Sequence, residues 1–237
     1  MTESGDLAIG LDALADWFSR LFTELDAMNS DFVDLLEQGT NPADDVTDLA
    51  RIGRAGIERR VQRFLLDHPS ADGAGVIFTR SRTATHEGVL EWWKRDDANG
   101  VARQSFGVNP THDRFYDYEQ LEWFVTPFRS GRHWITGPYI DYLGIDEYVV
   151  TLTTRTVVHG RPIGVTGIDM RMADFERALT PLIHRVPAPA ALLSSHYSVL
   201  VGNSSRFITG DRIERVPSGF HTTRLDAAGA TLYVVHR

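Results

Sequence analysis

The chain has 237 residues, a formal net charge of −8 and no cysteine, and 42% of its residues are hydrophobic. This length and composition are typical of an ordinary globular protein with one sizeable core, and they leave little room for two full domains. Acidic residues outnumber basic ones by 32 to 24, which argues against a nucleic-acid surface, and the lack of cysteine excludes disulfides, thiolate nucleophiles and cysteine-bound zinc.

The beginning of the chain predicts neither export nor a membrane anchor. Residues 1–6 are acidic and polar where a secretory leader would be basic, and the sequence contains no run of about 18 apolar residues. We therefore expect a cytoplasmic protein that is complete from Met1 and has no membrane partner.

The first 40 residues predict one long amphipathic helix. Its apolar residues are spaced alternately four and three positions apart. They are Leu11, Leu14, Phe18, Leu21, Leu25, Met28, Phe32 and Leu35. This heptad-like stripe has two interpretations. It is either a seam to a second copy of the chain, which would make a homodimer, or a face that packs on the helix's own domain.

A second helix is expected after the break at residues 39–42. Asn41 and Pro42 are the residue types of a helix cap and a first helical turn, and Pro69 ends the pattern. The apolar face expected to pack in the core consists of Val46, Leu49, Ile52, Ile57, Val61, Phe64 and Leu65. The arginines of this helix are interpreted as a solvated outer face rather than as a basic patch. They are Arg51, Arg54, Arg59, Arg60 and Arg63.

From residue 73 onward, short β-type runs separated by turns dominate the chain. Strands are expected at residues 74–78, 89–93, 134–140, 148–158, 161–170 and 191–201, with one more near 232–235. His159 and Gly160 are expected to form a hairpin turn, and residues 172–183 a short helix. Helices followed by a largely antiparallel sheet indicate the α+β class, with residues 41–237 as a single domain.

The most informative segment extends from Tyr116 to Met170. The aromatic residues in and next to it are Phe115, Tyr116, Tyr118, Trp123, Phe124, Phe128, Trp134, Tyr139, Tyr142 and Tyr148. Aromatic faces attract ammonium groups, and Asp169 is a carboxylate among apolar strand residues, which favours an opposite charge nearby. The combination predicts a pocket for a small cation. Large aromatic residues beside a sheet are also common in cores, so a structural role for Trp123 and Tyr139 stays open.

Alternation along the expected strand 161–170 places Asp169 on one face with Ile163, Val165 and Gly167. At the end of such a row, the carboxylate either contacts a ligand, reaches solvent, or caps the helix that begins near Met172. All three interpretations stay open.

These residues resemble a known family. The sequences Tyr116-Asp117, Trp123-Phe124, Gly137-Pro138-Tyr139-Ile140-Asp141, Gly164-Val165 and Gly167-Ile168-Asp169 are similar to the motif of Cache domains, the PAS-like ligand-binding sensor units of bacterial chemoreceptors and kinases. The resemblance covers about residues 46–170 and implies a PAS-like fold with long leading helices. It also implies that the Tyr, Trp, Tyr and Asp of the family's amino-acid site fall on Tyr116, Trp123, Tyr139 and Asp169.

In the amino-acid-binding members, the two tyrosines and the aspartate hold the amino group of the ligand, and the tryptophan and an arginine hold its carboxylate. That arginine falls on Leu121 in this chain, and a leucine cannot form the bidentate carboxylate pair of a guanidinium. The resemblance therefore implies an amine as the ligand. An amino acid is the alternative if Arg129 or Arg132 takes the place of the missing arginine.

The resemblance implies a small-molecule sensor rather than an enzyme, with no cofactor and no metal. Asp141, Asp117 and Glu122 are either contacts for a second amino group, as in a diamine, or solvated loop residues. Because the chain has no room for a signalling domain, we expect a free-standing sensor that passes its signal to a second copy, a separate transcription regulator or another signalling protein. Closure over the ligand would change how the first helix packs.

An enzyme is the main alternative class. None of the nine histidines lies in a metal-binding spacing such as His-Glu-x-x-His, and no Gly-x-Ser-x-Gly elbow or phosphate-binding glycine loop is present. His133, His159 and His196 are interpreted as structural. A small α+β enzyme that acts on a carbonyl substrate would use Asp169 and a tyrosine as acid and base.

Overall fold

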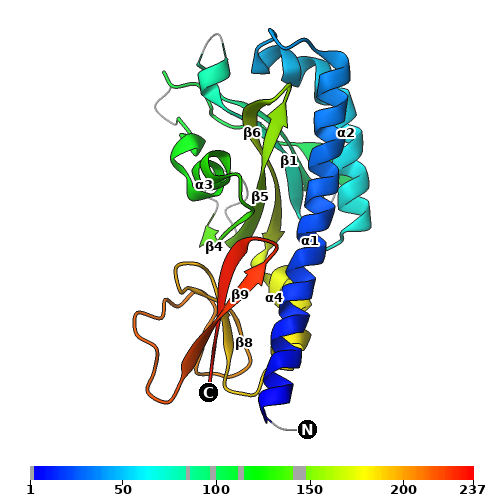
Figure 1. Cartoon of the computed structure of the whole chain (residues 1–237). Coiled ribbons are helices and arrows are strands. Elements are labelled where there is room, and N and C mark those ends of the chain that lie inside the picture. Colours follow the sequence, from blue (N-terminus) through cyan, green and yellow to red (C-terminus); the bar gives the residue numbers. More distant parts are fainter. Residues whose placement is uncertain (1–2, 84–85, 97–99, 112–114, 141–147) are drawn as a thin grey trace.

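The computed structural model describes residues 3–83, 86–96, 100–111, 115–140 and 148–237. Two long helices lie along a six-stranded sheet. A smaller four-stranded sheet lies beside the N-terminal part of the first helix (Figure 1). The start of the first helix and the C-terminus lie at the end of the molecule that carries the smaller sheet (Figure 1). Long N-terminal helices followed by antiparallel sheets confirm the predicted α+β class.

The elements have the following bounds. The helices are α1 (Glu3–Gly39), α2 (Val46–Asp67), α3 (Glu122–Ser130) and α4 (Met172–Ile183), with short 3-10 turns η1 (Arg80–Arg82) and η2 (Tyr118–Gln120). The strands are β1 (Gly73–Phe78), β2 (Val89–Asp96), β3 (Gly100–Arg103), β4 (Trp134–Ile140), β5 (Tyr148–Val158), β6 (Arg161–Arg171), β7 (Ala191–Leu193), β8 (Val199–Gly202), β9 (His221–Ala227) and β10 (Ala230–His236). Among these described helices, none combines the length and the apolar character needed to span a membrane.

Helix α1 buries its apolar stripe inside the chain itself, against α2, α4 and strands of both sheets. The fully or almost fully buried residues are Leu14, Phe18, Phe22, Leu25, Met28, Phe32 and Leu36. Phe22 and Leu36 take the places expected for Leu21 and Leu35, which are only partly buried, because a straight helix drifts away from a heptad repeat. The stripe therefore serves the chain's own core, which is the second of the two interpretations. A homodimer stays a prediction.

Helix α2 begins later than predicted. Asp45 caps it, since its Oδ1 accepts the backbone N–H groups of Thr47 at 2.8 Å and Asp48 at 3.0 Å. Asn41, the expected cap, instead donates its backbone N–H to the Asp44 carboxylate at 2.8 Å in the preceding turn. The predicted start is wrong because the Asp45 carboxylate reaches two otherwise free N–H groups of the first turn.

The larger sheet has the strand order β3-β2-β1-β6-β5-β4, and all neighbouring strands are antiparallel. Helices α1 and α2 cover one face, and α3 lies on the other (Figure 1). The predicted turn at His159 and Gly160 between β5 and β6 is confirmed, with φ angles of 49° and 70°. Neither β3 nor α3 was expected from the sequence, because both are short and Pro127, a residue that disfavours a helix interior, lies inside α3.

The smaller sheet has the strand order β8-β7-β10-β9. The strand expected over residues 191–201 is in fact two strands, and the turn between them holds Tyr197 at a φ of 63°. Strand β9 was not expected because its sequence, HTTRLDA, is mostly polar. One continuous set of buried apolar residues joins the two sheets, including Leu152 of β5, Leu192 of β7 and Leu232 of β10. The division into residues 1–40 and 41–237 stays a prediction.

A buried carboxylate ties α2 to the edge of the larger sheet. Glu91 of β2 is fully buried. Arg54 of α2 donates to it at 2.8–3.2 Å, and Arg103 of β3 donates at 3.0 Å. The hydrogen bond to Glu91 raises the pKa of Arg54, so the guanidinium stays charged. Arg54 is exposed, as predicted for the arginines of this helix, but it also pairs with a buried carboxylate.

We expect Glu91→Gln to lower the free energy of unfolding by about 2–3 kcal/mol, because an amide leaves two guanidinium charges unbalanced. The loss stays below that of a fully buried cluster since the Arg54 and Arg103 side chains are 49% and 42% exposed. Urea unfolding followed by tryptophan fluorescence measures the change. Glu214→Gln, at an exposed position, is the matched control, and equal losses in the two variants would contradict a special role for this ionic cluster.

Candidate ligand-binding site

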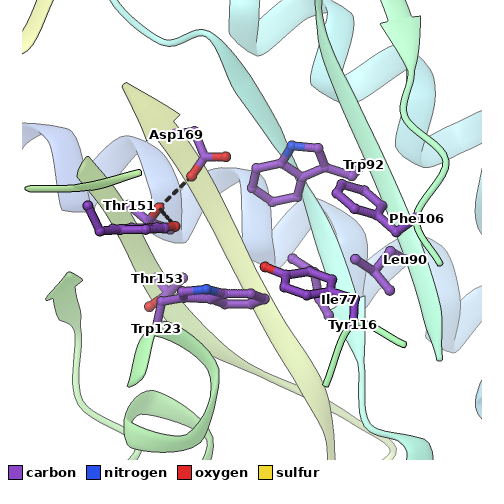
Figure 2. A pocket seen from close by; sticks show the side chains of 10 residues that line it. Ile77, Leu90, Trp92, Phe106, Tyr116, Trp123, Thr151, Thr153 and Asp169 are labelled. Carbon is purple, nitrogen blue, oxygen red and sulfur yellow. Dashed lines mark hydrogen bonds between the residues drawn. The ribbon is translucent and has the colours of Figure 1, made fainter. Parts of the chain in front are cut away.

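A small cavity lies on the face of the larger sheet that carries α3 (Figure 2). Its lining residues come from strands β1, β2, β4, β5 and β6, from α3, and from the chain between β3 and η2. They are Ile77, Leu90, Trp92, Phe106, Tyr116, Trp123, Tyr139, Thr151, Thr153 and Asp169. The cavity is partly open, and its volume is about 30 Å³, the space of one or two water molecules. A compact ligand therefore fits best, and a larger one requires the walls to move apart.

Strands β5 and β6 form the floor of this cavity. Thr151 pairs directly with Asp169 across the hairpin, and Thr153 pairs with Gly167. A Cβ atom on Gly167 would lie 2.9 Å from the Thr153 methyl group and 3.6 Å from the Trp92 ring. Glycine at this position therefore keeps the floor open.

A chain of hydrogen bonds orients Asp169. Thr151 Oγ1 donates to Asp169 Oδ1 at 2.6 Å, and the Tyr139 hydroxyl lies 2.7 Å from Thr151 Oγ1 (Figure 2). Because a threonine has one hydroxyl proton and this one goes to Asp169, Tyr139 is the donor to Thr151. The carboxylate is thus held in one direction, beside aromatic walls that cannot offset its charge.

Asp169 does not cap helix α4. The residue at the N-cap position is Arg171, and no side-chain hydrogen bond caps this helix end. The Asp169 backbone carbonyl accepts the N–H of Asp72 at 2.8 Å, while its side chain faces the cavity (Figure 2). The capping interpretation is therefore wrong for this residue.

The aromatic residues divide into a cavity wall and a core behind it. Tyr116 and Trp123 line the cavity. Tyr118 is fully buried, its ring stacks on Trp123 with the ring centres 6.5 Å apart, and its hydroxyl donates to the Phe78 carbonyl at 2.6 Å. Burial raises the pKa of Tyr118, so the phenol keeps its proton. Both interpretations of the aromatic cluster, pocket and core, therefore apply, each to different residues.

Two of the acidic residues considered as contacts for a second amino group pair elsewhere. Asp117 forms an ion pair with Arg80, which also contacts Glu119 at 3.1 Å. Glu122, at the start of α3, contacts the ring of His196 in the turn between β7 and β8. Neither Asp117 nor Glu122 is among the described lining residues, so the structure gives no support to their contact with a second amino group. They are not solvated loop residues either, because both are paired and Glu122 belongs to α3.

Of the predicted site residues, four come together in the cavity. They are Tyr116, Trp123, Tyr139 and Asp169. Leu121, the residue before α3, packs beside the aromatic cluster without lining the cavity. Asp141 lies outside the described residues. The ligand-binding roles of all six stay predictions.

Sequence reasoning missed six lining residues. They are Ile77, Leu90, Trp92, Phe106, Thr151 and Thr153. Alternation along the expected strands 74–78 and 89–93 was a usable signal for the first three. Phe106 follows the unexpected strand β3, and the two threonines depend on the register between β5 and β6.

The described lining residues include one carboxylate and no lysine, arginine or histidine. Trp123 lies in the first turn of α3, whereas Arg129 lies in the last turn and Arg132 follows the helix. Both arginines are exposed. Neither arginine is among the described lining residues, and the alternative in which one of them takes the place of the missing arginine stays a prediction.

The sequence model of the family described as "Methyl-accepting chemotaxis protein-like, first PDC sensor domain" matches residues 57–177, about half of the chain. The matched segment begins in α2 and ends in α4, so it contains every strand that lines the cavity. None of the proteins with curated functions matches this sequence.

The fold is similar to that of solved sensor domains. The ligand-binding domain of the Campylobacter jejuni chemoreceptor Tlp3 in complex with 4-methylisoleucine has a TM-score of 0.64 at 12% identity, covering 99% of this chain and 88% of that one. The ligand-binding domain of the Pseudomonas aeruginosa PAO1 amino acid chemoreceptor PctC in complex with GABA has a TM-score of 0.53 at 15% identity, covering 98% and 95%. A methyl-accepting chemotaxis protein X has a TM-score of 0.58 at 16% identity, covering 98% and 97%. These matches confirm the resemblance to Cache-type sensor folds.

Tyr118→Phe tests the core behind the cavity. At neutral pH we expect the free energy of unfolding to fall by about 1–2 kcal/mol, since the Phe78 carbonyl loses this donor. Because burial raises the pKa of Tyr118 in the folded state, the unfolded state ionises first, near pH 10, and the wild type loses stability as the pH rises further. The variant should lose less. Urea unfolding between about pH 7 and pH 11 measures both effects, the exposed Tyr148→Phe is the control, and parallel pH curves for the wild type and Tyr118→Phe would contradict the expectation.

Proposed function

Because the chain belongs to the methyl-accepting chemotaxis protein-like family of first PDC sensor domains, we propose that it is a Cache-type sensor whose cavity binds a small protonated amine. The observation that carries this proposal is Asp169, a carboxylate that faces an aromatic cavity with no cation among its described lining residues. The family consists of sensor domains, so a catalytic role for Asp169 and a tyrosine is not proposed.

An ammonium group matches this site in charge and in hydrogen bonding. It carries a full positive charge and N–H donors, one of which can bond to Asp169 and offset the carboxylate charge. The faces of Trp92, Trp123 and Tyr116 supply the negative quadrupoles that attract a cation. The hydrogen bond from Thr151 already holds Asp169 in place, so little side-chain freedom is lost when the ligand binds.

The ligands of two similar solved structures share an amino group with the proposed ligand. The ligands 4-methylisoleucine and GABA of two of those complexes each carry an amino group and a carboxylate. In this chain, the position of the arginine that the family resemblance implies is Leu121, and the described lining residues offer no cation to a carboxylate. We therefore favour an amine over an amino acid.

Signal transmission through α1 is the second part of the proposal. Asn29 of α1 accepts hydrogen bonds from Thr156 at 2.9 Å and Thr166 at 2.8 Å, which lie on β5 and β6. The same two strands carry Thr151 and Asp169. Closure of this strand pair around a ligand would shift the packing of α1 between two states. The receiver, whether a second copy, a transcription regulator or another signalling protein, stays a prediction, as does action as a free-standing cytoplasmic protein.

Asp169→Asn removes the charge and keeps an oxygen for the hydrogen bond from Thr151. We expect a small primary amine to stabilise the wild type by about 2.7 kcal/mol at 100 times its Kd. In the variant, the affinity should fall by at least about 30-fold, because removing one partner of a desolvated charge pair costs about 2–5 kcal/mol. Thermal shift and calorimetric titration with a panel of amines, diamines and amino acids measure both quantities.

Asp174→Asn changes a partly exposed carboxylate on α4 and is the matched control, which should bind like the wild type. The melting temperature of unliganded Asp169→Asn should barely change. Unchanged amine affinity in this variant, or a wild type that no amine of the panel stabilises, would count against the proposed function.

Amide hydrogen exchange tests the route through α1. With a saturating amine, we expect protection of the α1 amides around Asn29 to change. Asn29→Ala should still bind the amine but lose this response, because it removes the contact with Thr156 and Thr166. Gln38→Ala, at an exposed position of the same helix, should keep the response. If ligand leaves both the exchange of α1 and the oligomeric state unchanged in the wild type, the route is excluded.

A further inference from the structure

Two polar atoms in the same cavity have no hydrogen-bond partner among the described residues. They are Trp123 Nε1 and Thr153 Oγ1, and each exposes less than 1 Å². The whole Trp123 residue is 6% exposed and Thr153 is 0% exposed. One comes from α3 and the other from β5, and both line the cavity.

A buried donor without a partner is unfavourable, and native proteins rarely keep one. Thr151 lies two residues earlier on the same face of β5, and its hydroxyl donates to Asp169. The hydroxyl of Thr153 has no such acceptor among the described residues. Thr153 pairs with Gly167, two residues along the strands from the Thr151–Asp169 pair, and in Figure 2 the Trp123 ring is drawn near Thr153 and away from Asp169. The cavity therefore has two different ends: the Asp169 end favours a cation, and the Trp123 end favours a hydrogen-bond acceptor.

The chemistry of the two ends favours a neutral acceptor over a carboxylate. An indole N–H and a hydroxyl are uncharged donors, and the described lining residues contain no cation. A ligand carboxylate would lie in the same small cavity as Asp169, and two like charges in one site disfavour each other. It would also lose its hydration without gaining an ion pair. A hydroxyl or amide oxygen has neither disadvantage.

We propose that the ligand is a small primary amine that carries a neutral oxygen acceptor, as in an amino alcohol or an amino amide. Its ammonium group lies at Asp169, and its oxygen accepts hydrogen bonds from Trp123 Nε1 and Thr153 Oγ1. This inference rests on the proposed function, because it requires the amine at Asp169, and it adds a second recognition point. The small cavity volume of about 30 Å³ favours a separation of only a few bonds between the nitrogen and the oxygen.

Four probes with one carbon skeleton test the inference: isopropylamine, L-alaninol, L-alaninamide and L-alanine. Their amino groups sit on the same carbon, and one substituent changes from methyl to hydroxymethyl, carboxamide or carboxylate. In calorimetric titrations of the wild type at pH 7, we expect L-alaninol and L-alaninamide to bind about tenfold more tightly than isopropylamine. L-Alanine should bind at least about tenfold more weakly than L-alaninamide.

Thr153→Val keeps the shape of the side chain and removes its hydroxyl. We expect it to weaken L-alaninol binding about five- to tenfold and to leave isopropylamine binding within about twofold of the wild type. The melting temperature of the unliganded protein should not fall, since this hydroxyl has no partner to lose among the described residues. Trp123→Phe is the second variant, with the same expected loss of selectivity. Thr154→Val, on the opposite face of β5, is the control and should bind all four probes like the wild type.

Equal affinities of the wild type for isopropylamine and L-alaninol, or an L-alaninol affinity that neither Thr153→Val nor Trp123→Phe lowers, would overturn the inference and leave the proposed function intact. Tightest binding by L-alanine would overturn it in favour of an amino acid ligand. Absence of binding by all four probes would overturn the inference and the proposed function together.

Discussion

The candidate site depends on one hydrogen bond between neighbouring strands, from Thr151 Oγ1 to Asp169 Oδ1. A carboxylate beside apolar and aromatic side chains is unfavourable unless its charge is offset. Thr151 is a neutral donor, so it fixes the direction of the carboxylate and satisfies one acceptor position, but it leaves the charge in place. On the proposed function, a ligand ammonium group in the cavity contributes to that balance. Its binding then stabilises the folded protein, and more so as the ligand concentration rises.

The strand pair β5–β6 connects the cavity to the helix on the other side of the sheet. On the cavity side it carries Thr151 and Asp169, and on the helix side Thr156 and Thr166 contact each other at 2.8 Å and both donate to Asn29 of α1. Because a sheet is one chain thick, a change in strand position on one face also moves the side chains on the other. Helix α1 passes along both sheets (Figure 1) and is one of the elements that connect them, together with α4, which contacts β5, β6 and β8.

The sequence predicted the helical stripe, most strands and, through the family resemblance, the four residues that meet in the cavity. It did not predict Thr151, because counting back from the β5–β6 turn places Val150 opposite Asp169. A bulge after Thr156 shifts the register by one residue and so brings Thr151 to that place and to the cavity face. The predicted start of α2 was wrong for a similar reason. Several residues there have capping side chains, and the path of the chain, rather than local sequence, selects Asp45.

The proposed preference for an amine follows from the charges of the described lining residues. Leu121 lies outside the lining, and the described lining residues include one carboxylate, Asp169, and no cation, so their formal charge is −1. A monoamine brings that charge to zero. A zwitterion leaves the net charge of the site unchanged and adds a carboxylate that meets only neutral donors. A diamine changes the net charge to about +1 and brings a second ammonium group among aromatic and hydroxyl side chains. Specificity is a difference between affinities. On the proposed function, the leucine at position 121 therefore favours amines over amino acids, while Tyr116, Tyr139 and Asp169 hold the amino group.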